Sequence, residues 1–375
     1  MRVHVLGIPH TVSTLEYSSC AFTQKVVKLC KMLYGRGHHV IHYGHKDSKV
    51  ECTEHVTVTT GADLRAAYGN HNWRLKGFPN FRIDDKAYRA FYKRVIPAIA
   101  QKKQPGDFLM CAFGKAHAPI AASHPDLIPV ESGIGYATGT FSNFRIFESY
   151  AIMHAYMGVE AANLPRNTFW YDNVIPNAFD LDEFTYNEKG GGDYLLFLGR
   201  VTPGKGVSIV GQIARELKVR VIAAGAGDKK LFGKGVEYVG IASPGKRAKL
   251  LAGARATLCP STFMEPFCGV QIESMISGTP VISSDWGAFA ELNQHGKTGF
   301  RCHTFEQFLW AVQNIDKINR ADCRAQGVRF SLERVAPFYD EYLDTVNTVW
   351  KKEKGWYTLQ PDRKNLWNTS FNGMG

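Results

Sequence analysis

The chain has 375 residues, of which 45% are hydrophobic and 12% aromatic, so it exceeds the usual single-domain length and can fill packed cores. No apolar run approaches the roughly 20 residues that a helix needs to cross a bilayer, so no transmembrane segment is predicted. The net charge of +11 favours acidic partners such as nucleic acid or anionic lipid, although charge carries no information about fold.

Eight cysteines are scattered along the chain without a C-x-x-C pair, which argues against a zinc ribbon and against a disulfide framework. Thiols used in this way fit a reducing compartment. Residues 1–8 form a short strand-like run and show no signal-peptide cleavage pattern. We therefore expect a cytoplasmic protein.

The first half of the chain alternates strand and helix signals. Val3–Ile8 has the pattern of a strand, Ala21–Tyr34 that of an amphipathic helix, and His39–Tyr43 that of a second strand. Further short apolar runs are Phe108–Phe113, Ile128–Glu131 and Phe169–Ile175. This alternation predicts a parallel sheet covered by helices on both faces.

The region His71–Lys103 is strongly basic, with nine Lys and Arg against two Asp. If residues 84–103 form a helix, one face is an apolar stripe that would be buried, made of Tyr88, Phe91, Val95 and Ile99. Another face then carries Lys86, Arg89 and Lys93. Two interpretations stay open for this basic face: a solvated surface, or a surface that binds anions such as nucleic acid.

The second half repeats the alternation. The predicted strands are Tyr194–Leu198, Val219–Ala223, Val236–Val239, Ala256–Cys259 and Pro280–Ser283. The predicted helices between them include Ser208–Leu217, Pro244–Ala252 and Gly269–Ser277. Two Rossmann-like domains are the simplest interpretation, with the boundary expected between Pro176 and Asp193. A last helix is predicted over Ser331–Trp350, where apolar side chains recur at helical spacing.

Two carboxylates, Glu265 and Glu273, stand eight positions apart where a loop runs into a predicted helix that starts near Cys268 or Gly269. A helix start exposes unpaired N–H groups and a positive dipole end, which suit a phosphate. A carboxylate at that end and another about two turns along could accept from hydroxyl-rich groups on either side of the phosphate. Sugar, diphosphate and ribose together make a nucleotide-sugar. The alternative is that both glutamates are solvated surface residues.

The run from Glu265 to Glu273 resembles the E-x7-E motif of retaining GT-B glycosyltransferases of the family 4 type, also called group 1. The loop Leu198–Gly206 resembles the G-R-x4-K-G loop of the same family. A third segment, Ile175–Asp182, resembles the family's I-P-N-G-V-D entry into the second domain, with Ala178 in place of Gly.

This resemblance implies the α/β GT-B fold, in which two Rossmann-like domains face a cleft and a C-terminal helix crosses back to the first domain. The N-terminal acceptor-side domain would comprise residues 1–176 together with a returning tail, 351–375. The C-terminal domain, residues 177–350, would bind the nucleotide-sugar.

The resemblance also implies roles for individual residues of the second domain. Arg200 and Lys205 would neutralise the diphosphate, and Glu265 would accept from the sugar hydroxyls. Glu273 would accept from the ribose hydroxyls. The remaining expected donor-binding positions supply backbone groups or close turns: Gly199, Gly225, Gly240, Cys268, Gly269 and Val270.

The first half departs from the family's pattern at one candidate catalytic position. Many relatives carry a histidine after the strand that here reads Ile128–Glu131, and Glu131 stands at roughly that point. Glu131 is therefore the expected replacement, with a structural role as the alternative. His117 and His154 are expected to be structural histidines.

The implied function is a retaining transfer of a hexose or related sugar from a UDP- or GDP-sugar to an acceptor hydroxyl, on a glycan in the family's commonest case. No D-x-D motif follows a strand, since Asp180-Leu181-Asp182 lies at the linker, so a metal is not expected. No cofactor is expected either, because the nucleotide-sugar is a substrate.

Three alternatives stay open. The first is a glycosyltransferase that acts on hydroxylated bases of DNA and holds the nucleic acid through His71–Lys103. The second is a catalytically silent nucleotide-sugar-binding protein, and the third is a GT-B epimerase. A nicotinamide dehydrogenase is disfavoured because no G-x-G-x-x-G follows the first strand.

Overall fold

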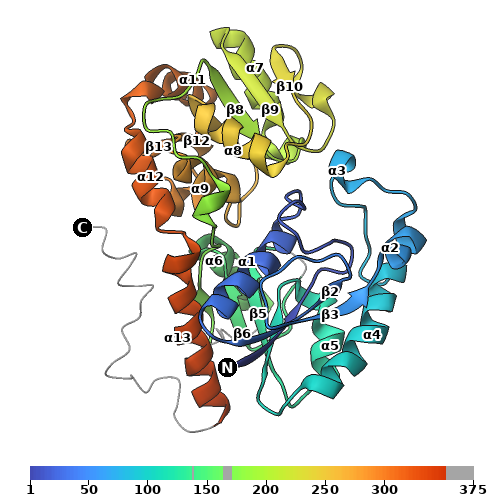
Figure 1. The fold of residues 1–375 in the computed structure, drawn as a ribbon. Helices are drawn as coiled ribbons and strands as arrows, with labels where there is room; N and C mark the ends of the chain where they lie inside the picture. Colours follow the sequence, from blue (N-terminus) through green and yellow to red (C-terminus); the bar gives the residue numbers. More distant parts are fainter. Residues whose placement is uncertain (137–138, 164–170, 352–375) are drawn as a thin grey trace.

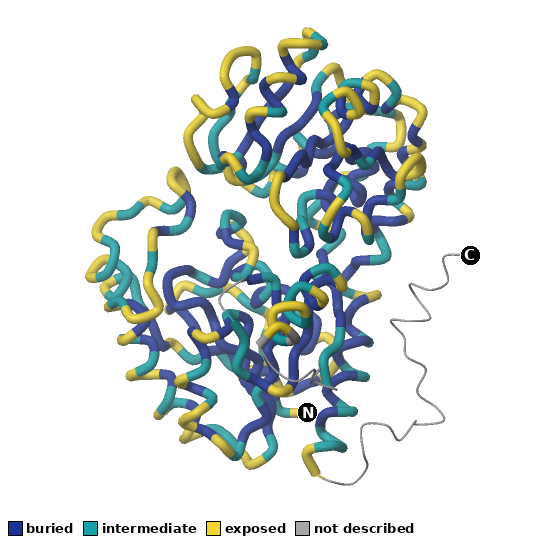
Figure 2. Tube along the Cα trace, turned by 180° about the vertical axis from the view of Figure 1, so that it is seen from behind, coloured by how far each residue is buried: buried dark blue, intermediate teal, exposed yellow. Residues whose placement is uncertain are grey.

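The computed structural model describes residues 1–136, 139–163 and 171–351. These residues form two α/β domains, one above the other in Figure 1. Figure 2 shows the same chain from behind, with buried residues along the strands of each domain and exposed residues on the surrounding loops and helix faces. No described helix is both long and apolar enough to cross a membrane.

The first domain contains a seven-stranded sheet in the order β3-β2-β1-β4-β5-β6-β7, and each pair of neighbours is parallel. Its strands are β1 (Arg2–Leu6), β2 (His39–His45), β3 (Glu54–Thr59), β4 (Phe108–Cys111), β5 (Ile128–Ile134), β6 (Phe144–Phe147) and β7 (Asn173–Val174). Its helices are α1 (Ala21–Gly35), α2 (Gly61–Tyr68), α3 (Trp73–Lys76), α4 (Lys86–Lys102), α5 (Ala118–Ala122) and α6 (Tyr150–Asn163). The predicted run Phe169–Ile175 lies partly outside the described residues.

Helix α4 shows why the local sequence folds as predicted. The Asp85 side chain caps it by accepting from the backbone N–H groups of Ala87 and Tyr88. All four residues of the expected apolar stripe are buried, which confirms that face of the helix. Three of the four, Phe91, Val95 and Ile99, belong to a core that also contains residues of β2 and β4.

The second domain contains a six-stranded parallel sheet in the order β10-β9-β8-β11-β12-β13. Its strands are β8 (Tyr194–Leu198), β9 (Arg220–Ala224), β10 (Val236–Tyr238), β11 (Ala256–Cys259), β12 (Val281–Ser284) and β13 (Gly299–Cys302). Its helices are α7 (Val207–Leu217), α8 (Pro244–Gly253), α9 (Gly269–Ile276), α10 (Ala288–Leu292), α11 (Phe305–Asn314) and α12 (Arg320–Val328). The prediction of two Rossmann-like domains is confirmed.

The last helix, α13 (Leu332–Trp350), follows the second domain but runs along the first (Figure 1). Its buried side chains, among them Val335, Tyr342 and Val346, belong to the core of the first domain. The expected helix that crosses back is therefore confirmed. The returning tail predicted over 351–375 lies almost entirely outside the described residues.

The chain crosses between the domains twice, and the two crossings lie side by side. The backbone N–H of Phe179 donates to the carbonyl of Phe330, and the N–H of Leu332 donates to the carbonyl of Phe179, both at 2.9 Å. The side chain of Ala178 belongs to the first core, whereas that of Phe179 belongs to the second. The expected division at residues 176 and 177 stays a prediction.

Candidate active site

A cleft of about 920 Å³ lies between the two domains and is lined by residues of both. On the second-domain side its wall is formed by the loops that follow β8, β9 and β11. Ligands of open α/β sheets bind beyond the carboxyl ends of the strands, and this wall has that position.

The loop after β8 packs closely against the loops after β9 and β11 because glycine occupies two positions. Gly225 has a φ of 147°, and a Cβ there would overlap the carbonyl of Gly199. Gly206 has a φ of 67° and abuts the carbonyl of Pro260, so it also excludes a side chain. The loop from Gly199 to Gly206 is thus held by backbone contacts and presents its side chains to the cleft.

Lys205 and Glu265 meet on this wall. The Lys205 Nζ donates to Glu265 Oε1 at 2.5 Å, and the Ser261 hydroxyl donates to the same oxygen at 2.5 Å. Glu265 is only 3% exposed. Burial acts to lower the pKa of Lys205, but the neighbouring Cys268 and Glu265 outweigh it and raise that pKa. Lys205 is therefore a charged lysine on the wall of the cleft.

Arg200 is exposed and also lines the cleft. Its guanidinium lies 5.9 Å from the ring centroid of Phe78, which belongs to the first domain. The Arg200 side chain is therefore directed across the cleft, toward the opposite wall.

Helix α9 begins at the cleft as expected. Cys268 is its N-cap, with a φ of 59°, a left-handed conformation that is uncommon for a residue with a side chain. Cys268, Gly269 and Val270 all line the cleft. The first N–H groups of a helix have no partner within it, so this end offers backbone donors to an anion.

Glu273 lies further along α9 and forms an ion pair with Arg247 of α8, whose Nε is 2.8 Å from Glu273 Oε2. Both side chains line the cleft. Arg247 is not among the residues that the sequence predicts for the donor site. Gly225 lies on the cleft as expected, whereas Gly240 lies behind it and accepts from the N–H of Gly225 at 2.9 Å.

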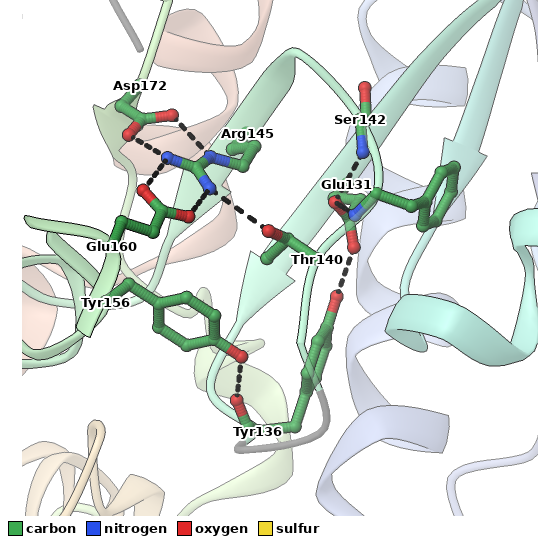
Figure 3. Close-up of polar contacts among 9 residues, drawn as sticks. Glu131, Tyr136, Thr140, Ser142, Arg145, Tyr156, Glu160 and Asp172 are labelled. Carbon is green, nitrogen blue, oxygen red and sulfur yellow. Dashed lines mark hydrogen bonds and ion pairs between the residues drawn. The ribbon is translucent and has the colours of Figure 1, made fainter. Parts of the chain in front are cut away.

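The structure does not bring Glu131 to the cleft. Its side chain is 0% exposed and accepts from the Tyr136 hydroxyl at 3.0 Å and from the N–H groups of Phe141 and Ser142 at 2.8 and 3.0 Å (Figure 3). Burial raises the pKa of Glu131, and the two backbone donors and the tyrosine lower it in part. The Glu131 carboxylate thus holds the segment that follows β5 in place. Tyr136, which belongs to that segment, lines the cleft, whereas Glu131 does not.

Another polar group on the first-domain wall was missed from the sequence. Lys25 forms an ion pair with Glu148 and donates to the carbonyl of Gly133 at 2.8 Å. Asn177 donates to the other oxygen of Glu148 at 2.6 Å. All three side chains line the cleft. The available signal was Asn177, which stands in the I-P-N segment at the domain boundary.

The domains also contact each other beside the cleft. Glu291 of α10 accepts from the N–H groups of Tyr150 and Ala151, at 3.0 and 2.6 Å, and so caps α6 of the first domain. The Ser149 hydroxyl donates to the carbonyl of Pro266 at 2.6 Å. Because Pro266 follows Glu265 directly, this bond ties the first domain to the loop that carries the candidate site.

Comparisons with known proteins agree with this geometry. Residues 192–316 match the family described as "Glycosyl transferases group 1". An uncharacterized glycosyltransferase of Methanocaldococcus jannaschii is 29% identical over 171 residues, which are 39% of this chain and 43% of that protein. A phosphatidyl-myo-inositol mannosyltransferase of Mycobacterium tuberculosis is 29% identical over 33% of this chain and 38% of its own length. The matches thus span less than half of these relatives.

Solved structures extend the likeness to the whole fold. AviGT4, a glycosyltransferase involved in avilamycin A biosynthesis, has a TM-score of 0.69 and 20% identity, covering 92% of this chain and 98% of its own. Anabaena HepE in complex with UDP and glucose has a TM-score of 0.66 and 16% identity, covering 92% of this chain and 100% of its own. The architecture of two facing Rossmann-like domains is the one that these proteins share.

Proposed function

We propose that this chain, a group 1 glycosyltransferase with the GT-B fold, transfers a hexose or related sugar from a UDP- or GDP-sugar to an acceptor hydroxyl, with retention at the anomeric carbon. One observation carries the proposal: Arg200, Lys205, Glu265 and Glu273 all line a single cleft at the carboxyl ends of β8, β9 and β11. Relatives whose names include glycosyltransferase activity support it.

Each donor-side group has a role that its contacts fit. Lys205 and Arg200 neutralise the diphosphate, Lys205 as a point charge and Arg200 through its planar fork. The N–H groups at the start of α9 complete the anion site. Glu265 accepts from the sugar hydroxyls, and Glu273, oriented by Arg247, accepts from the ribose.

The reaction builds positive charge on the anomeric carbon while the diphosphate departs. Cations that hold the departing diphosphate stabilise the transition state more than the ground state, because negative charge on the diphosphate increases as it leaves. They therefore increase turnover. We propose that these cations act without a metal. Among the described residues, no group of three or more His, Cys, Asp or Glu side chains is placed to hold a metal ion.

The proposal is tested first by thermal stabilisation with UDP, GDP, ADP, CDP and dTDP, each with and without magnesium. A nucleotide at about 100 times its Kd should add roughly 2.7 kcal/mol of stability. We expect UDP or GDP to stabilise the protein without magnesium. If none of the five nucleotides raises the unfolding temperature, either with or without magnesium, the protein has no preformed donor site.

Two substitutions then separate binding from turnover. Glu273→Ala should weaken nucleotide binding, because the ribose contact is lost and Arg247 is left unpaired. Lys205→Ala should lower kcat by roughly 100-fold or more, a typical loss when a group that stabilises transition-state charge is removed. Hydrolysis of a labelled nucleotide-sugar, measured over a range of its concentrations, gives both the KM for the donor and kcat. Unchanged kinetics in both variants would refute the site assignment.

A further inference from the structure

The first-domain wall of the cleft is aromatic. Four phenylalanines line it and are only partly buried: Phe22, Phe78, Phe81 and Phe113. Their rings are contiguous, since the centroids of Phe22 and Phe113 are 5.2 Å apart and those of Phe81 and Phe113 are 5.7 Å apart. Lys25 Nζ covers one face of Phe22, 4.3 Å from its centroid, and His10 stacks on one face of Phe81, so a ring can stack on the faces that these groups leave.

His10 lies within this wall and has one free nitrogen. It is 2% exposed, lines the cleft, and stacks on Phe81 with ring centroids 3.8 Å apart. Its Nδ1 is 2.9 Å from the Tyr88 hydroxyl, and neither side chain has another hydrogen bond among the described residues. We assign the Tyr88 phenol as the donor to Nδ1, which places the proton of the neutral imidazole on Nε2. Burial lowers the pKa of His10 to about 3, which keeps the ring neutral.

The charges that line the cleft do not balance. Four acidic side chains line it, and each is paired with a cation: Glu148 with Lys25, Glu183 with Lys28, Glu265 with Lys205 and Glu273 with Arg247. Three further cations on the wall, Lys76, Lys115 and Arg200, have no acidic partner among the described residues. Arg200 is accounted for by the diphosphate, whereas Lys76 and Lys115 belong to the first domain and are not.

The aromatic wall adjoins the donor site. The ring of Phe78 lies 6.0 Å from that of His10 on one side and 5.9 Å from the Arg200 guanidinium on the other. Figure 1 shows α3, the helix that precedes Phe78, reaching toward the second domain. A Cβ built on Gly77 would lie 3.3 Å from the side chain of Ala226, so this segment touches the loop after β9. A molecule stacked on the wall is therefore next to Arg200, which the proposed function assigns to the diphosphate.

We propose that this wall is the acceptor subsite, and that the acceptor is a planar unsaturated ring that carries the reacting hydroxyl and an anionic group. The inference rests on the proposed function and replaces the glycan expected from the family by a more specific class. The ring stacks on the phenylalanines, an oxygen of the acceptor accepts from His10 Nε2, and the anion lies against Lys76 and Lys115.

The transfer balances within this arrangement. The hydroxyl oxygen of the acceptor forms the new bond to the anomeric carbon, and the bond from that carbon to the diphosphate breaks. Its electron pair leaves with the diphosphate, which also takes the hydroxyl proton. Two sources supply such an acceptor: a small aromatic acid, or a hydroxymethylated pyrimidine whose phosphate is the anion.

Matched alcohols test the inference. With the nucleotide-sugar that hydrolyses fastest, kcat/KM is measured for benzyl alcohol, cyclohexylmethanol, 4-(hydroxymethyl)benzoate and 5-hydroxymethyl-2′-deoxycytidine 5′-monophosphate, with a methyl glycoside for comparison. We expect benzyl alcohol to exceed cyclohexylmethanol by at least ten-fold and each anionic acceptor to exceed benzyl alcohol. Equal values for the first two, or transfer to the methyl glycoside alone, would overturn the proposal. The better of the two anionic acceptors identifies the source.

Variants assign the effect to the wall. Phe81→Leu keeps an apolar side chain but removes the ring, and should abolish the preference for benzyl alcohol over cyclohexylmethanol. Tyr34→Leu, an exposed position on α1 away from the cleft, is the matched control. His10→Phe should lower kcat/KM for all acceptors, and His10→Gln should restore part of it by supplying an N–H. A preference that persists in Phe81→Leu would overturn the assignment.

The two proposals fail differently. If no nucleotide stabilises the protein and no nucleotide-sugar is hydrolysed, the glycosyltransferase activity itself is wrong. If donor hydrolysis is normal but planar and saturated alcohols react equally, only the acceptor subsite is wrong. The variants of His10 and Phe81 should leave the thermal shift with nucleotide unchanged, which also checks that they fold.

Discussion

At the scale of single residues, Glu131 shows what sequence position can and cannot predict. Its place after β5 suggested a catalytic residue, because relatives carry a histidine near that point. The sequence does not show that the chain returns at Phe141 and Ser142, whose N–H groups both donate to Glu131 Oε2, while the Tyr136 hydroxyl donates to Oε1 (Figure 3). Three hydrogen bonds to one buried carboxylate favour the structural role over the catalytic one.

We therefore predict that Glu131→Gln destabilises the fold by about 1–3 kcal/mol and leaves donor binding unchanged. The neutral amide oxygen accepts from the two backbone N–H groups more weakly than the carboxylate does, and the NH2 group replaces the oxygen to which the Tyr136 hydroxyl donates. Urea denaturation measures the loss, and nucleotide titration checks the donor site. Glu216→Gln, the same change at an exposed position of α7, should have no effect. A stable Glu131→Gln variant without turnover would restore the catalytic interpretation.

The position of Arg247 in the sequence indicated that it needs a partner, although it belongs to none of the family's motifs. It lies in the first turn of α8, where a cation faces the positive end of the helix dipole and is unfavourable. A cation at such a position needs a compensating partner, and the structure supplies Glu273. Sequence alone could not name that partner, since the two residues lie on different helices and meet only in the folded domain.

At the scale of elements, long periodic segments and uncharged apolar runs could be predicted, whereas several short segments that contain a charge could not. Helix α4 repeats its apolar stripe over four turns, so its buried face is fixed by local pattern alone. The four-residue strands β6 and β13 and the four-residue helix α3 were not predicted. Each of these three contains a basic residue, whereas the equally short β4, β11 and β12 are uncharged and were predicted as strands. The conformation of the three missed segments is decided by the neighbouring strands or domain.

The free energy of unfolding should depend on pH because His42 is buried where the strands β2 and β3 pair. His42 Nδ1 lies 3.0 Å from His55 Nδ1, and burial, with the neighbouring His55, lowers the pKa of His42 to about 3. An unfolded histidine has a pKa near 6.5. Between pH 6.5 and about 3 the unfolded chain therefore binds a proton that folded His42 does not, so stability falls as the pH falls.

We predict that His42→Gln reduces the slope of unfolding free energy against pH by about 1.4 kcal/mol per pH unit between pH 6 and 4. The glutamine oxygen can still accept from His55, so the strands should remain paired. Urea denaturation across this range gives the slope. His39→Gln, at the exposed start of the same strand, is the control and should leave the slope as it is. An unaltered slope in His42→Gln would mean that His42 is protonated in the folded protein.

At the scale of the whole molecule, the two sheets and the returning helix could be predicted, because each domain repeats a local βα pattern and the resemblance supplies the order. The contacts between the domains could not. The carboxylate of Glu291, for example, caps α6, which is a helix of the other domain. Such a contact exists only once both domains are folded and placed together.

We predict that Glu291→Ala loosens the contact between the domains. Removing an N-cap typically costs about 0.5–2 kcal/mol, and here the helix and its cap belong to different domains. Hydrogen exchange should therefore accelerate at the amides of Tyr150 and Ala151, while the amides of β8 and β11 keep their protection. Glu306→Ala, at the start of α11 within the second domain, is the control and should change neither region.

The paired crossings at Phe179 and Phe330 have a mechanical consequence. Two strands joined by hydrogen bonds cannot swivel independently as a single linker can, so the domains are restricted to bending about the line that these strands define. A ligand that binds to either wall of the cleft can therefore move the domains in only one way, by opening or closing the cleft. The stiffness of these few peptide units, which lie at the edge of the cleft, therefore sets how readily the cleft opens and closes around its ligands.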